Sequence, residues 1–198
     1  MEKHLSGKVA LVSGAARGIG AATAHLLASE GAFVVIGDVR DDLGSAEAKG
    51  IGDRAVYRRL DVRDLGDWKR AVASAVEMFG KLDILVNNAA IVAYGLIEDV
   101  SVEEFVSVFE VNQLGCFLGM KAAIPAMRSS GGGSIINISS LGGMRGTPTT
   151  AAYSATKWAV RGMRFPAGSL NAVPGALYFT AGINHEADGL FGDIIPRA

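Results

Sequence analysis

Residues 8–31, KVALVSGAARGIGAATAHLLASEG, contain the signals that decide the fold. The segment Lys8–Ser13 is a short apolar run, which predicts a buried strand of a parallel sheet. Three glycines within residues 14–20 predict a tight turn, and residues 21–30 predict a helix that ends at Gly31. Such a turn brings backbone N–H groups and a helix N-terminus to one point, where a pyrophosphate binds well. The alternative is an ordinary tight turn without a ligand.

Segments of strand and helix type alternate through the following residues. Four further strands are expected at residues 32–37, 55–60, 82–86 and 134–139, and helices at residues 41–50, 65–79, 101–112 and 114–127. Helices of this length between strands imply right-handed crossovers and parallel pairing. We therefore predict an α/β fold, a three-layer Rossmann-type doubly wound parallel sheet, formed as a single domain by residues 1–198.

Polar residues follow the carboxyl ends of the predicted strands, where ligands sit in such sheets. Asp38 is placed to accept hydrogen bonds from an adenosine ribose diol and to repel a 2′-phosphate, which favours NAD over NADP. Arg17 and Arg40 are also close in sequence, and either can pair with a phosphate, so NADP stays open. Without a nucleotide, Asp38 would be a helix cap or a turn residue.

A second group of polar residues lies in residues 139–157, SSLGGMRGTPTTAAYSATK. Tyr153 and Lys157 are four residues apart, so they share one face of a helix. An ammonium beside a phenol would lower the phenol pKa from about 10. Ser140, at the end of the fifth strand, can reach the same substrate oxygen. The group predicts proton transfer to a carbonyl or from a secondary alcohol, although a half-buried tyrosine with a solvated lysine gives the same spacing.

Composition excludes several other classes of protein. The net charge of −1 predicts neither nucleic-acid nor anionic-membrane binding, and no apolar segment is long enough to span a membrane. The single cysteine, Cys116, cannot form an internal disulfide and is expected to be a structural thiol in a cytoplasmic protein without a signal peptide. His185 and Glu186 lack a further histidine at ligand spacing, so no metal is expected.

Taken together, these motifs resemble the short-chain dehydrogenase/reductase family over residues 8–163. The glycine motif, the pair Asp61-Val62, the run Asn87-Asn88-Ala89-Ala90, and Ser140 thirteen residues before Tyr153 occur in the family's order. Ala90 replaces a glycine of the family pattern. The cofactor-binding residues indicated by the glycine motif and the resemblance are Gly14, Arg17, Gly18, Ile19, Gly20, Asp38, Asp61, Val62, Asn88, Ala89, Tyr153, Lys157, Pro174 and Gly175.

The resemblance implies a catalytic role for each of four residues. Tyr153 would be the general acid/base, Lys157 would lower its pKa and bind the nicotinamide ribose, and Ser140 would stabilise the substrate oxygen. Asn112 would hold a water in a proton relay to Lys157, although its spacing among apolar neighbours favours a satisfied buried amide. The substrate would be a small ketone or secondary alcohol, and the family implies a homo-oligomer.

The sequence departs from the family pattern in residues 164–198. Pro166 and Gly168 interrupt the helix of Tyr153, and residues 171–175 place an expected sixth strand and Pro-Gly loop about a dozen residues early. The following threonine would be Thr180, one position late, and no seventh strand is evident. Three functions follow: an NAD-dependent oxidoreductase, a dinucleotide-binding protein without turnover, or a non-catalytic interaction protein. The catalytic set favours the first, and the altered C-terminal region favours the second.

Overall fold

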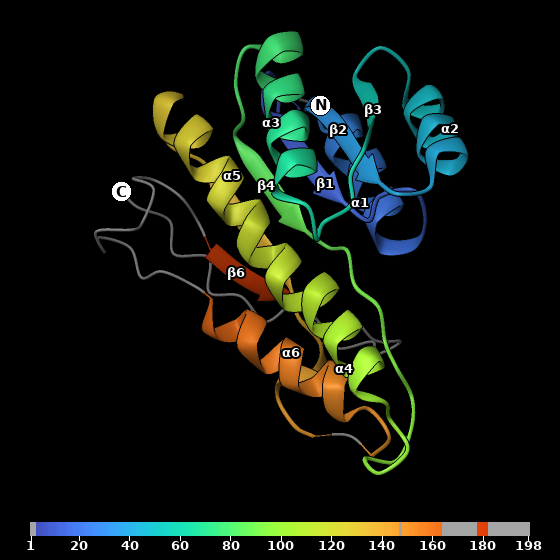
Figure 1. Ribbon diagram of the computed structural model, residues 1–198. Coiled ribbons are helices and arrows are strands. Elements are labelled where there is room, and N and C mark those ends of the chain that lie inside the picture. Colours follow the sequence, from blue (N-terminus) through green and yellow to red (C-terminus); the bar gives the residue numbers. More distant parts are fainter. Residues whose placement is uncertain (1–2, 147, 164–177, 182–198) are drawn as a thin grey trace.

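The computed structural model describes residues 3–146, 148–163 and 178–181, which form one twisted parallel sheet with helices on both faces (Figure 1). The sheet has the order β3-β2-β1-β4-β5-β6. Its strands are β1 (Val9–Ser13), β2 (Phe33–Asp38), β3 (Ala55–Arg59), β4 (Ile84–Asn87), β5 (Ser134–Ile138) and β6 (Tyr178–Ala181). The helices are α1 (Gly18–Ser29), α2 (Asp41–Ile51), α3 (Leu65–Phe79), α4 (Val102–Phe109), α5 (Gly115–Ser129) and α6 (Ala151–Gly162). The predicted Rossmann-type fold is therefore confirmed.

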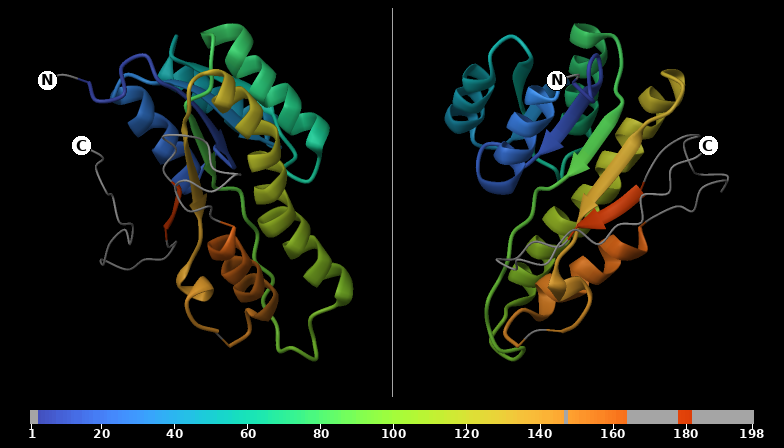
Figure 2. Two further views of the ribbon diagram at one scale, coloured as in Figure 1. Left: turned by 90° about the vertical axis from the view of Figure 1, so that its left-hand side faces the viewer. Right: turned by 180° about the vertical axis from the view of Figure 1, so that it is seen from behind.

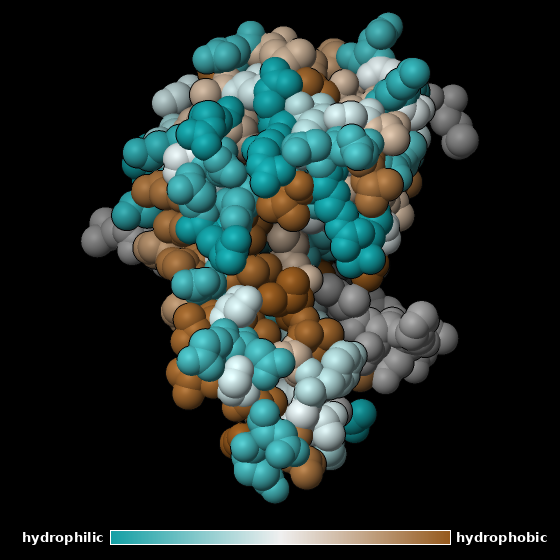
Figure 3. All heavy atoms as spheres, turned by 45° about the vertical axis from the view of Figure 1, so that its right-hand side comes forward, coloured by the Kyte–Doolittle hydropathy of each residue, from teal (hydrophilic) through white to brown (hydrophobic). Residues whose placement is uncertain are grey.

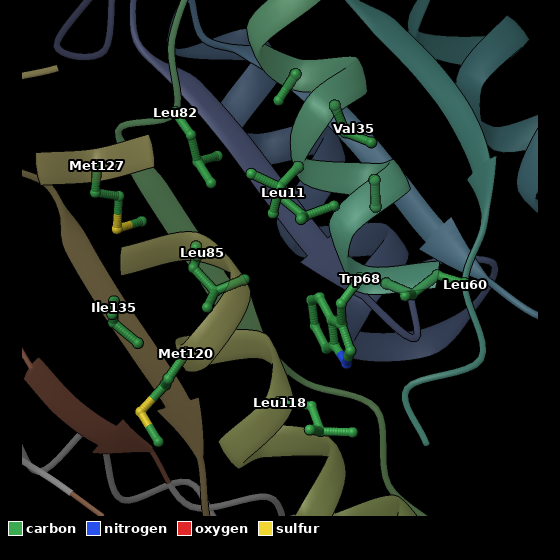
Figure 4. Packing of buried hydrophobic residues seen from close by; sticks show 14 of the residues in the cluster. Leu11, Val35, Leu60, Trp68, Leu82, Leu85, Leu118, Met120, Met127 and Ile135 are labelled. Carbon is green, nitrogen blue, oxygen red and sulfur yellow. The ribbon is translucent and has the colours of Figure 1, made fainter. Parts of the chain in front are cut away.

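Two apolar cores lie on the two faces of the sheet, and the views in Figure 2 show the helices that cover them. On one face, Leu11 and its neighbours pack against α3 and α5, with Trp68 fully buried beside Leu118 (Figure 4). On the other face, Ala10 and Val12 pack against the alanines of α1. Successive residues of a strand point to opposite faces, so both faces of a central strand must be apolar. This explains why β1 reads as a continuous apolar run.

Two helix boundaries differ from the sequence-based expectation. The first helix begins at Gly18 and not at the expected residue 21. Gly18 and Gly20 can form part of its first turn, because the N–H groups of a first helical turn need no partner within the helix. The expected break near residue 113 is a π-helical turn, η1 (Glu110–Leu114), that runs directly into α5. The start of α4 is as expected: Ser101 and Glu104 form a reciprocal capping box. The π turn carries Asn112, one of the candidate catalytic residues.

Several expectations concern the C-terminal part of the chain. Residues 171–175 lie outside the described residues, and the sixth strand that the structure does describe, β6, follows the Pro-Gly pair. Thr180 lies within this strand, in register with Asn137 of β5. Among the described residues β6 is the last strand, so the expectation about a seventh strand falls on residues outside the description. In the part of the chain that the structure describes, no helix is both long and apolar enough to cross a membrane.

Candidate functional site

The turn between β1 and α1 has a backbone that suits glycine. Gly14 and Gly18 have φ angles of 65° and 58°, in the left-handed region. A Cβ on Gly14 would lie 2.8 Å from the Cα of Ala89, and one on Gly20 would overlap the carbonyl oxygen of Gly14. Arg17 occupies the N-cap of α1 without a side-chain capping bond. The first N–H groups of the helix therefore face the carboxyl end of the sheet, where an anion can bind them.

Hydrogen bonds tie this turn to the end of β4. The Asn88 Nδ2 group donates to the carbonyl oxygens of Ser13 and Gly14, at 2.9 and 3.0 Å. In return, the backbone N–H groups of Asn88 and Ala89 donate to the Ser13 hydroxyl, at 3.1 and 3.2 Å. Asn88 thus positions the glycine turn through its side chain. The sequence did not predict that the Ser13 hydroxyl accepts these two hydrogen bonds. The only signal for it is the position of Ser13 at the end of a strand.

Asp38 lies at the end of β2 with its carboxylate directed at the glycine turn. One carboxylate oxygen accepts a hydrogen bond from the Ala16 N–H and the other accepts one from the Arg40 N–H, both at 3.0 Å. Each oxygen keeps a free lone pair for a further donor. Among the described residues, neither the Arg17 nor the Arg40 side chain forms an ion pair. The Asp38 carboxylate therefore keeps acceptor capacity at the end of β2.

Asp61 and Val62 follow β3 at the same edge of the sheet. The Asp61 carboxylate forms an ion pair with Arg63 at 2.6 Å, and this hydrogen-bonded guanidinium holds its pKa below the ordinary value. Val62 is buried, and its carbonyl oxygen accepts a hydrogen bond from the Trp68 indole at 2.9 Å. Asp61 is therefore ionised and oriented at the edge, whereas the Val62 side chain belongs to the core beneath it.

Tyr153 and Ser140 meet above the end of β5. The Ser140 hydroxyl is buried at the strand end, close enough to the half-buried Tyr153 side chain to lower its pKa. It also accepts a hydrogen bond from the Gly142 N–H. Burial raises the pKa of Tyr153, and the nearby Ser140 hydroxyl partly offsets this rise. Tyr94, in the loop after β4, lies close enough to raise it further. The two hydroxyl groups therefore form a pair that can hydrogen-bond one substrate oxygen.

The predicted effect of Lys157 on Tyr153 is not what the structure shows. Lys157 is on the same face of α6, but its Nζ donates to the Ile138 carbonyl oxygen at 2.7 Å and lies 5.6 Å from the Tyr153 ring centroid. Burial lowers the pKa of Lys157 itself to about 8, since a charged ammonium loses hydration there. The Tyr153 pKa is accordingly raised by burial and not lowered by the lysine.

Asn112 is buried in the π turn with its side chain engaged. Its Nδ2 donates to the Ile91 carbonyl oxygen at 2.9 Å and to the Thr156 hydroxyl at 3.2 Å, and its Oδ1 accepts from the Ile91 N–H at 2.8 Å. This is the buried amide that the apolar neighbours favoured. It joins the loop after β4 to α6, and its part in a proton relay stays a prediction.

Three further contacts hold α6 against the end of β5. The Ser139 hydroxyl donates to the Lys157 carbonyl oxygen at 3.0 Å, and Arg161 donates to the Gly143 carbonyl oxygen at 2.7 Å. Asn137 of β5 donates to the carbonyl oxygen of Met163, just past the helix end, at 3.3 Å. The sequence did not predict these contacts. Ser139 and Ser140 are adjacent and of the same type, so the sequence does not show which of the two faces the helix. They position the helix and do not face the site.

The structure brings most of the predicted residues to one edge of the sheet and leaves two undescribed. Gly14–Gly20, Asp38, Asp61 and Asn88 lie at the ends of neighbouring strands, and Ser140, Tyr153 and Lys157 lie at the end of β5. Pro174 and Gly175 fall outside the described residues. Within that description, no three His, Cys, Asp or Glu side chains cluster as metal ligands, and His185 and Glu186 lie beyond it.

Comparison with known proteins agrees with this geometry. The family model for short chain dehydrogenase matches residues 8–165. A trans-4-hydroxycyclohexanecarboxylate dehydrogenase from Sinomonas cyclohexanicum is 52% identical over 79% of this chain and 63% of its own length. A 3-alpha-(or 20-beta)-hydroxysteroid dehydrogenase from Mycobacterium tuberculosis is 48% identical over 82% of this chain and 63% of its own length.

A cyclopentanol dehydrogenase from Comamonas testosteroni is 41% identical over 80% of this chain and 64% of its own length. The chain therefore spans less than two thirds of the length of these curated relatives. The matched part includes both strand-end clusters, from the glycine turn to Lys157.

Proposed function

Since the chain belongs to the short-chain dehydrogenase/reductase family, we propose that it is an NAD-dependent oxidoreductase that interconverts a secondary alcohol and a ketone by hydride transfer. The observation that supports this best is the placement of Ser140 beside Tyr153 at the same sheet edge as the glycine turn. One cluster is built to hold a dinucleotide, and the other is built to exchange a proton with a substrate oxygen.

The residues present fit a nicotinamide dinucleotide. The absence of a Cβ at Gly14 and Gly20 lets the turn pack against Ala89 and Asn88. The turn and the open first turn of α1 suit the pyrophosphate, and Asp38 has lone pairs left for a ribose diol. When bound, the cofactor supplies or accepts the hydride. The acidic group at Asp38 supports NAD over NADP, with Arg17 and Arg40 as the residues that would bind a 2′-phosphate instead.

The proton chemistry falls to Tyr153 and Ser140. In reduction, the Tyr153 hydroxyl donates its proton to the carbonyl oxygen; in oxidation, the phenolate takes the proton of the alcohol. The Ser140 hydroxyl donates a hydrogen bond to the same oxygen as negative charge develops there. The raised pKa of Tyr153 keeps the phenol protonated near neutral pH, which suits the acid role in reduction. Lys157 lies on the same helix, with its Nζ bonded to the Ile138 carbonyl oxygen.

The substrate class we propose is an alcohol or ketone on a carbocyclic skeleton. The relatives are described as acting on hydroxycyclohexanecarboxylate, a hydroxysteroid and cyclopentanol. In this chain the loop after β4 places Ile91, Val92 and Leu96 partly exposed, in the same loop as Tyr94 beside Tyr153. Apolar side chains at this place suit a hydrocarbon ring better than a charged substrate.

The test is a calorimetric titration of the purified chain with NADH and NADPH, followed by turnover of cyclic ketones. We expect micromolar NADH binding, weaker NADPH binding, and turnover that Tyr153→Phe abolishes with NADH affinity nearly intact. Phenylalanine keeps the ring and removes only the hydroxyl, so a variant that still turned over would show that another group transfers the proton.

A second candidate is a dinucleotide-binding protein without turnover. It is favoured by the family-model match, which ends at residue 165, and by the match to the curated relative from Sinomonas cyclohexanicum, which covers 63% of that relative's length. NADH binding without turnover of any ketone by the unmodified chain would select this candidate. Absence of binding of both NADH and NADPH would exclude both candidates.

We also propose a cytoplasmic homo-oligomer. Exposed apolar side chains gather in the half of the molecule that contains α4 and α6, visible as brown surface in Figure 3. Those on the helices are Val102, Phe105, Val106, Phe109, Phe117 and Trp158. Exposed apolar surface of this kind is typical of protein interfaces. Light scattering after size exclusion should give a mass at least twice the 20.5 kDa of the chain, and Phe105→Asp should reduce it.

A further inference from the structure

Two side chains of β3 are bonded to the turn that leads from β2 into α2. β3 is the strand beside β2 in the sheet, and α2 packs next to it (Figure 1). Tyr57 and Arg59 are two residues apart on β3, so their side chains lie on the same face of the strand. A Cβ on Gly44 of α2 would overlap the Tyr57 ring, so this face is the one that α2 covers.

The Tyr57 hydroxyl reaches both ends of this turn. It donates to the backbone carbonyl oxygen of Asp38 and to Asp41 Oδ1, each at 2.7 Å, and so shares its one proton between two acceptors. The Leu60 N–H donates to the same Asp38 carbonyl oxygen at 2.9 Å. Burial and the hydrogen bond to Asp41 raise the pKa of Tyr57, so the phenol keeps its proton at neutral pH. Two donors from the neighbouring strand thus hold the backbone of Asp38.

Arg59 adds two further bonds to the turn. Its Nη1 donates to the Val39 carbonyl oxygen and to Asp41 Oδ2, each at 2.9 Å. Asp41 therefore accepts from Tyr57 with one carboxylate oxygen and from Arg59 with the other. The ion pair is exposed and adds little stability by itself, but it orients the carboxylate that the Tyr57 hydroxyl contacts.

We propose that Tyr57 is a positioning residue that sets the preference for a nucleotide with a free adenosine ribose diol over one with a 2′-phosphate. By holding the Asp38 backbone, Tyr57 fixes the direction of the Asp38 carboxylate, whose oxygens accept from the Ala16 and Arg40 N–H groups. A carboxylate already in place binds a diol without first being ordered, and it stays where it repels a phosphate. This role rests on the proposed function, since it determines which nucleotide that same site selects.

The ring and the hydroxyl of Tyr57 have separable contacts. The ring packs against α2 at Gly44, whereas the hydroxyl bonds only the turn. Tyr57→Phe keeps the ring and removes the hydroxyl, so α2 stays packed while the Asp38 carbonyl oxygen loses one of its two donors. Tyr57 is only partly buried, so the variant should fold, and urea unfolding checks this.

The test is calorimetric titration of the unmodified chain and Tyr57→Phe with NADH and with NADPH. NADH affinity should fall about three- to tenfold, as expected for one lost hydrogen bond, and NADPH affinity should change less than about twofold. The ratio of the two affinities should therefore fall about threefold or more. Ser29→Ala is the control, since it also removes a hydroxyl bonded to a backbone carbonyl oxygen, at the far end of α1. Its ratio should equal that of the unmodified chain.

A double variant separates positioning from general support of the fold. In Asp38→Ala, adding Tyr57→Phe should change NADH affinity less than about twofold, because the carboxylate that Tyr57 orients is gone. Equal losses of NADH affinity with and without the Asp38 carboxylate would show that Tyr57 supports only the fold, and would overturn the proposal.

The same titrations separate failure of this role from failure of the proposed function. An unchanged affinity ratio in Tyr57→Phe, with NADH still bound by the unmodified chain, would overturn the role of Tyr57 and leave the proposed function standing. An unmodified chain that bound neither NADH nor NADPH would overturn the proposed function, and the role of Tyr57 with it.

Discussion

The Ser139 hydroxyl donates a hydrogen bond to the backbone carbonyl oxygen of Lys157 at 3.0 Å, which joins the end of β5 to the helix of Tyr153. The junction is closely packed, since a Cβ on Gly143 would lie 2.5 Å from the Ser139 oxygen and 2.6 Å from that carbonyl oxygen. Tyr153 and Ser140 come from these two elements. Their mutual position therefore depends on a serine that does not face the site.

We predict that Ser139→Ala lowers the free energy of unfolding by about 1–2 kcal/mol, because a buried polar contact is lost. It should also lower kcat while changing NADH affinity less than about twofold, since the glycine turn is elsewhere. Urea unfolding, turnover and calorimetry measure the three effects. Ser129→Ala is the matched control, because its hydroxyl bonds a carbonyl oxygen on the exposed end of α5. An unchanged kcat in Ser139→Ala would contradict the positioning role.

A second prediction concerns Gly20 in the first turn of α1. Alanine normally favours a helix, but a Cβ at Gly20 would overlap the Gly14 carbonyl oxygen and lie 2.6 Å from Asn88 Nδ2. Gly20→Ala should therefore destabilise the chain by about 1–3 kcal/mol, as overpacked sites do, and weaken NADH binding at least tenfold.

Gly50 in α2 provides the control for this substitution. A Cβ there would have its nearest neighbour at 3.7 Å, so Gly50→Ala should raise stability by about 0.5–1 kcal/mol and leave NADH binding unchanged. Thermal unfolding and calorimetry compare the two variants. Equal NADH affinities in both would show that the turn does not contact the cofactor.

The sequence predicts the elements of this fold well because their signals are local. The apolar run before Gly14 specifies a strand buried on both faces, and the spacing of Tyr153 and Lys157 places both on one face of a helix. The direction of the Lys157 ammonium depends on where the Ile138 carbonyl oxygen lies, on another element. Local spacing carries no information about that contact. The raised Tyr153 pKa was missed for the same reason.

Contacts between distant segments were the other part that the sequence did not predict. Asn112 bonds Ile91, 21 residues earlier, and Asn88 bonds Ser13, 75 residues earlier. Each amide has several residues within reach in principle, and only the packed elements select one. The residue types and strand ends thus predicted where the site lies, and tertiary packing determined which atoms face each other.

A third prediction tests cofactor selectivity. Asp38→Ala removes the acceptor offered to a ribose diol and the negative charge that repels a 2′-phosphate. NADH affinity should fall at least tenfold and NADPH affinity should rise, as measured by parallel titrations. Asp42→Ala, an exposed carboxylate on α2, should change neither. If Asp38→Ala leaves the ratio of the two affinities unchanged, Arg17 and Arg40 determine the selectivity.

A fourth prediction follows from the burial of Lys157, which lowers its pKa from 10.5 to about 8. Below pH 8 both folded and unfolded chains hold this proton, and the buried charge costs stability. Between pH 8 and pH 10.5 the unfolded chain binds more protons than the folded one, so unfolding free energy rises with pH. Burial raises the pKa of Tyr153, which acts in the opposite sense above about pH 10.

Urea unfolding at pH 7.5 and 9.5 isolates the lysine term when unmodified chain and Lys157→Met are compared. The unmodified chain should gain about 2 kcal/mol more than the variant over this interval, since each pKa unit corresponds to about 1.4 kcal/mol. Lys121→Met removes an exposed lysine of α5 and should follow the unmodified chain. Parallel curves for Lys157→Met and the unmodified chain would mean that Lys157 titrates at its ordinary pKa, and that its bond to the Ile138 carbonyl oxygen cancels the effect of burial.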